Sequence, residues 1–296
     1  MSLVINHNLM AMGAARSLGL TYGRLATSVA RLASGLRINS AADDAAGLAI
    51  RESMRTDIRV LNQGVRNAND AISLIQTADG ALSVIDEKLT RMKELAEQAS
   101  TGTYTSAQRL IMDSEYQAMA SEISRIAQAT DFNGVKLLDG SLSGTGLTGA
   151  SGQQMKIHFG TGNSSAEDYY YIRIGNATSS ALGVGNAAGA GQAGYTISTQ
   201  SAAQAALEAI DTAVQNKDNI RANLGSIANR LSNTISNLSI QAENLQSAES
   251  RISDVDVATE MTEFTRNQIL VQAAVAMLAQ ANSLPQLALQ LISGGP

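Results

Sequence analysis

Cysteine and tryptophan are absent from this 296-residue chain, and histidine occurs only twice, at His7 and His158. The lack of cysteine excludes disulfides, thiolate chemistry and cysteine-based zinc sites. With two histidines far apart in the sequence, neither a histidine metal cluster nor a Ser-His-Asp triad is predicted. We therefore expect no metal site, no cofactor and no enzymatic activity.

Charged and aromatic residues are also scarce, at 16% and 3% of the chain. In a typical domain about a quarter of the residues are charged. The net charge of −5 gives no electrostatic footprint for nucleic acid or an anionic membrane, so neither is expected as a partner. With 44% hydrophobic residues, many of them alanine, the composition indicates slender packed helices rather than a bulky aromatic core.

The first residues, Met1–Met12, contain no Lys or Arg and no small-residue cleavage site. This pattern predicts that a cleaved secretory signal peptide is absent. The protein is therefore expected either in the cytoplasm or outside the cell after export by another route.

The segment from Asn267 to Pro296 has no charged side chain, although eleven large aliphatic residues are spread through it. Its longest uninterrupted apolar run is only Ala273–Ala279, whereas a membrane span needs about 20 largely apolar residues. A helix that is apolar on nearly all sides but carries Gln and Asn is typical of one buried among other protein helices. We therefore expect this tail to need protein partners on several sides.

Near the N-terminus, apolar residues alternate at spacings of four and three, which predicts a heptad seam. The seam ends near Gly35, and Ser40 with Asp43 has the form of a capping arrangement at the start of a new helix. We interpret Asn39–Asp44 as a loop and helix start, with its adjacent carboxylates favouring the helix dipole rather than acid/base chemistry. The seam residues are Leu18, Tyr22, Leu25, Val29, Leu32 and Leu36.

The next helix is predicted from about residue 43 to residue 100, because apolar residues repeat every seven positions without a break. A shorter helix is expected over Ser106–Ala129, with Ile111, Met119, Ile123 and Ile126 on its buried side. Stripes of this kind are typical of a multi-helix bundle. The seven-residue repeat consists of Leu61, Ala68, Ile75, Leu82, Leu89 and Ala96.

Between Gly140 and Gly194 lie 13 of the 25 glycines, with strand-like runs at Met155–Phe159 and Tyr169–Ile174. This composition predicts a small loop-rich region with a β-hairpin. The glycines Gly144, Gly146 and Gly149 match the dinucleotide pattern G-x-G-x-x-G. That site is excluded here because the pattern requires a preceding strand and a following helix, and a strand-like run follows instead.

The helical pattern resumes at about Ser201 and continues to Val255. We predict a mainly α fold: a long antiparallel helical hairpin or coiled-coil bundle with a small β-hairpin-rich distal region. A hairpin of this kind brings the N-terminal arm and the uncharged C-terminal arm to the same end. The predicted parts are an N-terminal arm (1–42), N-terminal rod helices (43–139), a small Gly/Ser-rich variable region (140–200), a C-terminal rod helix (201–255) and a C-terminal arm (256–296).

Four separated segments resemble bacterial flagellin in the order that this family shows. They are LASGLRINSAADDAAGLAI at Leu32–Ile50, DFNGVKLL at Asp131–Leu138, ESRISDVDVATEM at Glu249–Met261 and QANSLPQ at Gln280–Gln286. The resemblance covers about the first 140 and the last 95 residues, and only the centre is unlike the family.

The resemblance implies a structural subunit of the flagellar filament, a homo-oligomeric helical polymer in the extracellular flagellum. It also implies export in an unfolded state by the flagellar type III apparatus, with an export chaperone, and polymerisation beneath a filament cap. In the family, both terminal arms form the coiled-coil inner tube of the filament. On this basis the expected self-assembly residues are Leu18, Leu25, Val29, Leu32, Leu270, Val275, Leu278, Leu284, Leu287 and Leu291.

Many flagellins are also recognised by a Toll-like receptor through the first rod helix. The matching stretch is Leu89–Gln98, and by position Arg91, Leu95 and Glu115 are expected to carry recognition. Thr90 stands where the family usually has Gln. The simpler interpretation is that these are ordinary exposed residues of a rod.

Three other functions remain as alternatives. The hook–filament junction protein of the same family shares the terminal pattern, although the stretch after Asp44 and the Gln280–Gln286 tail favour the filament subunit. A flagellin-like peptidase needs a metal-binding histidine pair with a glutamate, and His158 stands alone in the centre. A membrane-active amphipathic protein predicts that the monomer binds liposomes.

Overall fold

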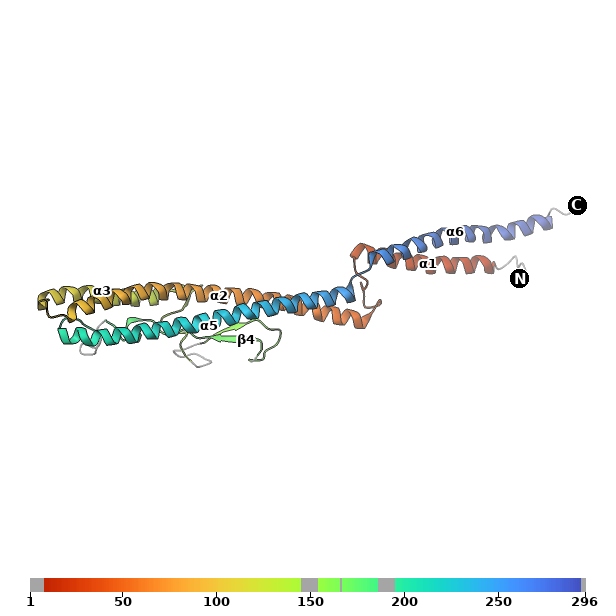
Figure 1. Cartoon of the computed structure of the whole chain (residues 1–296). Coiled ribbons are helices and arrows are strands. Elements are labelled where there is room, and N and C mark those ends of the chain that lie inside the picture. The colour runs from red at the N-terminus through yellow and green to blue at the C-terminus, as the bar shows by residue number, and fades with distance from the viewer. Residues whose placement is uncertain (1–7, 145–153, 166, 186–194, 294–296) are drawn as a thin grey trace. The chain divides into compact units, whose positions relative to one another are not determined.

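The computed structural model describes residues 8–144, 154–165, 167–185 and 195–293, with side chains described up to Gln286 in the last helix. The chain forms two compact units, one of residues 1–58 with 243–296 and one of residues 59–242. Helix α2 (Ala45–Ser100) and helix α5 (Gln200–Ser253) each contribute to both units. The mainly helical fold with small antiparallel strand pairs is confirmed (Figure 1).

In the first unit, helices α1 (Leu9–Ser34) and α6 (Val257–Ser293) lie side by side and antiparallel (Figure 1). Asn8 Nδ2 donates to Ala281 O at 2.7 Å near one end of the pair, and Val255 N donates to Gly35 O at 3.0 Å near the other. Asn8 also caps α1 by accepting from Ala11 N, and α1 ends at Gly35 because its φ of 71° is left-handed. The two arms therefore meet as the hairpin topology predicts.

The contact between α1 and α6 uses smaller residues than the predicted heptad seam. Tyr22 and Val29 are 51% and 48% exposed, so their placement in a seam within one subunit is wrong. Thr21 and Ser28, one position earlier, face α6 instead, because small side chains let two helices approach closely. We call the following buried and half-buried positions the α1–α6 seam: Ala14, Leu18, Thr21, Leu25, Ser28 and Leu32 on α1, and Phe264, Asn267, Val271, Ala274, Leu278 and Ala281 on α6.

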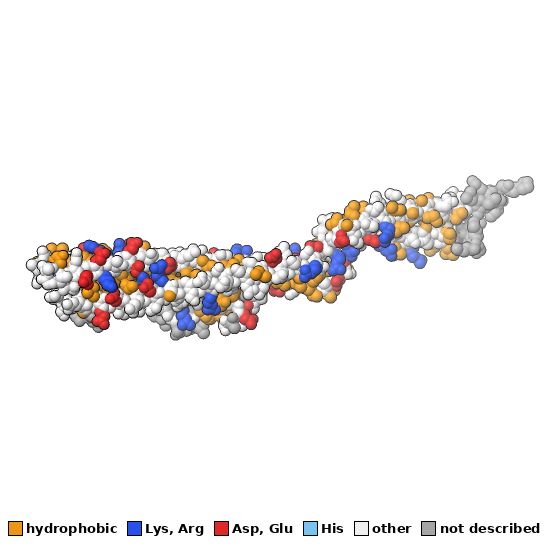
Figure 2. Space-filling model, in the orientation of Figure 1, with side chains coloured by type: hydrophobic (Ala, Val, Ile, Leu, Met, Phe, Trp, Pro, Cys, Tyr) orange, Lys and Arg blue, Asp and Glu red, His pale blue; other side chains and the backbone are white. Residues whose placement is uncertain are grey.

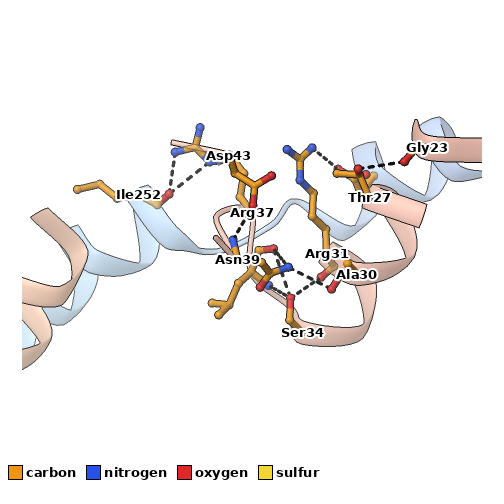
Figure 3. Close-up of polar contacts among 11 residues, drawn as sticks. Gly23, Thr27, Ala30, Arg31, Ser34, Arg37, Asn39, Asp43 and Ile252 are labelled. Atoms are coloured by element: carbon orange, nitrogen blue, oxygen red, sulfur yellow. Dashed lines mark hydrogen bonds and ion pairs between the residues drawn. The ribbon is translucent and has the colours of Figure 1, made fainter. Parts of the chain in front are cut away.

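The segment that follows α1 is tied to the end of α5 by backbone and guanidinium hydrogen bonds (Figure 3). Arg37 N donates to Ser253 O at 2.7 Å, and the Arg37 guanidinium donates to Ile252 O at 2.7 and 3.3 Å. Asn39 Nδ2 donates back to Ala30 O at 3.2 Å, and Arg31 lies 3.6 Å from the Glu260 carboxylate. These contacts fix the direction in which the chain leaves α1.

Helix α2 begins later than predicted, and a different residue caps it. Asp43 accepts hydrogen bonds from the backbone N of Ser40 and of Asn39, which lower the pKa of Asp43. Its carboxylate therefore closes a turn before the helix and is not available to the helix itself. The Asp44 carboxylate accepts from Gly47 N at 2.9 Å and caps α2, so the predicted capping by Ser40 and Asp43 is wrong.

The second unit is built on α2, α5 and helix α3 (Ser106–Ala129). The predicted seven-residue repeat of α2 is confirmed as core, since all six of its members are at most 4% exposed. Ion pairs show that α5 runs antiparallel to α2, because the partner on α5 moves toward its C-terminus as the partner on α2 moves toward its N-terminus. The pairs are Lys93–Asp211 at 2.5 Å, Asp86–Lys217 at 2.5 Å and Asp79–Arg221 at 2.7 Å.

On α3, Ile123 is buried and Met119 and Ile126 pack against the core, as predicted. Ile111, however, is 73% exposed, and its predicted burial is wrong. At about 100° per residue, Ile111 points about 140° away from the fully buried Tyr116. The buried stripe of α3 instead consists of Tyr116, Ala120, Ile123 and Ala127.

Two short hairpins complete the second unit, together with helix α4 (Ser179–Leu182). Strands β1 (Asp131–Phe132) and β2 (Val135–Lys136) are joined by Asn133 and Gly134, whose φ values of 51° and 80° suit a two-residue hairpin turn. Strands β3 (Met155–His158) and β4 (Tyr169–Ile172) pair antiparallel within the predicted runs.

The β3–β4 hairpin packs along α2 rather than beyond the ends of the helices. Asn67 Nδ2 donates to His158 O at 2.8 Å. A Cβ placed on Gly64 would lie 2.1 Å from Phe159 O, so only glycine permits this approach. The hairpin lies here because α3 carries the chain back along α2 before the strands begin.

Candidate self-assembly surfaces

Helices α1 and α6 expose large apolar side chains outside their shared seam (Figure 2). Monomeric soluble proteins rarely expose extended apolar patches, and such patches mark interaction sites. We call this set, whose members are 44% to 71% exposed, the outer apolar face: Leu9, Met10, Met12, Leu20, Tyr22 and Val29 on α1, and Val257, Met261, Ile269, Leu270, Val275 and Met277 on α6.

The residues predicted for self-assembly fall into two groups. Val29, Leu270 and Val275 belong to the outer apolar face and are free to contact another molecule. A second group is half-buried within the unit and includes the seam residues Leu18, Leu25, Leu32 and Leu278, together with Leu284. The side chains of Leu287 and Leu291 lie outside the described residues.

A shallow groove of about 370 Å³ runs between α1 and α6 on the same unit. An apolar groove between two helices can receive the apolar face of a third helix. The groove contains no charged side chain, so an entering helix needs no matching charge. Its lining consists of Leu9, Met10, Gly13, Ala14, Ser17, Ala274 and Met277.

The residues predicted for receptor recognition do not all reach the surface. The Arg91 guanidinium is exposed and lies 2.8 Å from Glu115 and 2.9 Å from Glu94. Hydrogen bonds to Glu94 and Glu115 raise the pKa of Arg91. Leu95 is only 2% exposed, so a direct contact from Leu95 to a receptor is wrong for this chain. Leu95 packs into the core because it follows Met92 on the buried stripe of α2.

Features that could suggest chemistry have structural roles in the described residues. The His158 ring stacks on Tyr169 at 6.0 Å, and both Asp43 and Asp44 accept backbone hydrogen bonds. In the described part of the chain, no group of three or more His, Cys, Asp or Glu residues could hold a metal ion. Of the glycine pattern, Gly146 and Gly149 lie outside the described residues. None of the described helices is long and apolar enough to cross a membrane.

Lys217 is a buried charged residue that the sequence pattern had not identified. Lys217 is 2% exposed, and its Nζ lies 2.5 Å from Asp86 and 2.8 Å from Asp218. Its position in the sequence carries a signal, because Lys217 is seven residues after Ile210 and seven before Leu224, both of which are buried. An apolar repeat with one lysine at the same position indicates a charged residue inside a helical core.

Comparisons with known proteins agree with this architecture. The bacterial flagellin N-terminal helical region matches residues 5–143, and the bacterial flagellin C-terminal helical region matches residues 207–292. A flagellin of Halalkalibacterium halodurans is 44% identical over 98% of this chain and 100% of its own length. The flagellar filament 33 kDa core protein of Treponema phagedenis is 40% identical over the same shares of the two chains.

A solved structure of a putative flagellar hook-associated protein from Vibrio parahaemolyticus shares the fold, with a TM-score of 0.55 and 16% identity. The match covers 72% of this chain and 100% of that chain. The hook–filament junction alternative is not favoured, because the relatives at 40% to 44% identity are flagellins and filament core proteins. Two terminal helical regions of the right kind, in the right order, and relatives that match along nearly the whole sequence place the chain in the bacterial flagellin family.

Proposed function

We propose that this structural subunit of the bacterial flagellar filament polymerises through the outer apolar face and the groove of its α1–α6 pair. The observation that carries the proposal is the position of the large apolar residues. Between its larger apolar members, the seam within the subunit uses small and polar residues such as Thr21, Ser28 and Asn267, while the members of the outer apolar face are exposed. Burial of exposed apolar surface drives protein association, so copies of the same pair are the natural neighbours.

The lack of charge on the last part of α6 supports the same proposal. After Arg266 no residue of the chain carries a charged side chain. A helix with neighbours on every side has no solvated face on which a charge can be stabilised, because an unpaired charge is costly to bury. We propose that α6 is surrounded by protein in the assembled filament.

Charged substitutions on the outer apolar face test this proposal. The double variant Leu270→Glu, Val275→Glu should lose polymerisation, because each new carboxylate would be buried without a partner at the interface. The monomer should keep its helicity, since both positions are more than 40% exposed. Electron microscopy and sedimentation measure polymerisation, and circular dichroism measures helicity.

A matched control adds the same charge elsewhere. Gln215→Glu with Ser236→Glu places two carboxylates at exposed positions of α5 and should leave polymerisation intact. Normal filaments from the Leu270→Glu, Val275→Glu variant would contradict the proposal.

The family places the filament in the extracellular flagellum, and we propose type III export as the route to it. An export chaperone and a filament cap are further proposed partners. The names of the relatives support these proposals only as far as the filament itself, since they are flagellins and a filament core protein.

We also propose recognition by a Toll-like receptor through Arg91 and Glu115. Both side chains are more than 40% exposed and form one ion-paired cluster with Glu94. Arg91→Ala should lower receptor signalling by the monomer at least about tenfold, which is typical for loss of an arginine that anchors an interface. Arg125→Ala is the control, because Arg125 is also exposed and ion-paired but lies on α3 with Glu122. Equal signalling by the Arg91→Ala variant and the parent would remove the receptor from the proposed partners.

A further inference from the structure

Lys217 occupies a core position in the apolar stripe of α5. Residues seven apart along this helix are all buried, and Lys217 is the one charged member among them. A lysine at such a position destabilises the core but can specify how two helices are aligned. The buried repeat consists of Ala203, Ile210, Lys217, Leu224, Leu231 and Leu238.

The lysine ammonium has one carboxylate partner on each of the two helices. Its Nζ lies 2.5 Å from Asp86 Oδ1 on α2 and 2.8 Å from Asp218 Oδ1 on α5 itself. Burial lowers the pKa of Lys217, but hydrogen bonds to Asp218 and Asp86 outweigh burial, so the pKa is raised overall. The amine therefore stays charged inside the unit and depends on Asp86 for its contact across the two helices.

The apolar residues alone do not define this alignment. On α2 and on α5 they recur every seven residues, so a shift of one heptad again places apolar side chains opposite apolar side chains. Such a shift moves one helix by about 10 Å along the other, at 1.5 Å per residue. Another feature must distinguish the native alignment from the alignments shifted by one heptad.

A shift in one direction would bring Lys217 to the level that Ile210 now occupies. The ammonium would then lie about 10 Å from its present level beside Asp86. It would instead approach Lys93, which in the native alignment pairs with Asp211 at 2.5 Å. Lys217 would keep Asp218, which moves with it on α5, but a buried ammonium that loses its contact to Asp86 and gains a like charge is destabilised.

A shift in the other direction would bring Ile210 to the level of Lys217. Lys217 would then move from the level of Asp86 toward that of Asp79, and Asp211 would take the place of Asp218 beside Asp86, with no cation between the two carboxylates. Like charges held at close range destabilise such an arrangement. Lys217 thus opposes displacement in the first direction, and Asp86 opposes it in the second.

We infer that Lys217 and Asp86 are a positioning pair that fixes the axial alignment of α5 on α2 against slippage by one heptad. This role is separate from the polymerisation surfaces proposed above, because both residues lie in the unit of residues 59–242. The pair specifies one arrangement of two helices whose apolar repeats permit several.

Distance measurements between two labels test the inference in the full-length monomer. Because the chain has no cysteine, nitroxide labels can be attached at Ser73→Cys and Thr212→Cys, which are exposed positions of α2 and α5. The otherwise unchanged chain should show one distance by pulsed electron paramagnetic resonance. Lys217→Met should add a population about 10 Å longer, and Asp86→Asn should add one about 10 Å shorter.

Three further variants make the result specific to the pair. Lys217→Arg keeps the charge and should show the same single distance as the labelled parent chain. Arg125→Met removes an exposed ion pair within α3 and should leave the distance unchanged. Lys217→Gln replaces Lys217→Met if the latter does not fold. A single parental distance in both the uncharged Lys217 variant and Asp86→Asn overturns the inference, and so do shifts of the opposite sign.

Discussion

Truncation of the chain after Arg266 is expected to abolish filament formation. The deletion removes the α6 half of the seam from Asn267 onward and four members of the outer apolar face, the last of them Met277. Helix α1 then lacks most of its partner, so both proposed polymerisation surfaces are lost together. No filaments should be visible by electron microscopy at concentrations where the full chain polymerises completely.

The same truncation should leave the unit of residues 59–242 folded, because its core is made by α2, α3, α5 and the short strands. Circular dichroism should show a loss of helix confined to the equivalent of α1 and α6, and thermal unfolding of the remainder should stay cooperative. A chain that ends at Ser293 keeps the whole of α6 and serves as the control. Filaments from the chain that ends at Arg266 would refute the role proposed for α6.

The heptad repeat of α2 could be predicted from the sequence because its buried stripe is continuous and made of aliphatic residues. The turn at Asn133 and Gly134 also has a local signal, since an Asn-Gly dipeptide readily adopts left-handed φ values. Both features depend on local sequence, and tertiary contacts do not override them. Local sequence patterns therefore suffice to predict the long core helix and the first hairpin turn of the second unit.

The α1–α6 seam could be predicted only in part: Leu18, Leu25 and Leu32 lie in it, but its other members on α1 are not the most apolar residues of that helix. Thr21 and Ser28 face α6, whereas Tyr22 and Val29 are exposed. A pattern of apolar residues cannot distinguish the face used within a subunit from the face used between subunits. For this protein we propose that the exposed apolar residues make the contacts between subunits.

Contacts between segments far apart in the sequence could not be predicted for a different reason. The close approach of Phe159 to Gly64 joins segments far apart in sequence, and a glycine in a helix predicts no particular neighbour. Lys217 was overlooked because a charged residue is normally solvated, and only its spacing from Ile210 and Leu224 marks it as buried. Periodicity applied to every residue, whatever its polarity, would have found it.

Leu89→Ala is expected to destabilise the second unit by about 2 to 5 kcal/mol, which is typical when a buried leucine is truncated. Leu89 is a fully buried member of the α2 repeat, in a core to which α3 and α5 also contribute. In a unit of this size each kcal/mol lowers the melting temperature by about 2 to 4 °C. Calorimetry of the monomer should therefore show a melting temperature lower by about 4 to 20 °C.

Val84→Ala is the matched control, because Val84 lies on the same helix but is 42% exposed. A truncation at an exposed position should change the free energy of unfolding by no more than about 0.5 kcal/mol.

Polymerisation is expected to reduce the effect of Leu89→Ala. Neighbouring subunits can stabilise a weakened monomer by mass action, since they bind only the folded form. Leu89→Ala monomers should therefore melt early, yet filaments grown from them at low temperature should melt closer to the parent. Equal melting of the Leu89→Ala and Val84→Ala monomers would contradict the central place of Leu89 in this core.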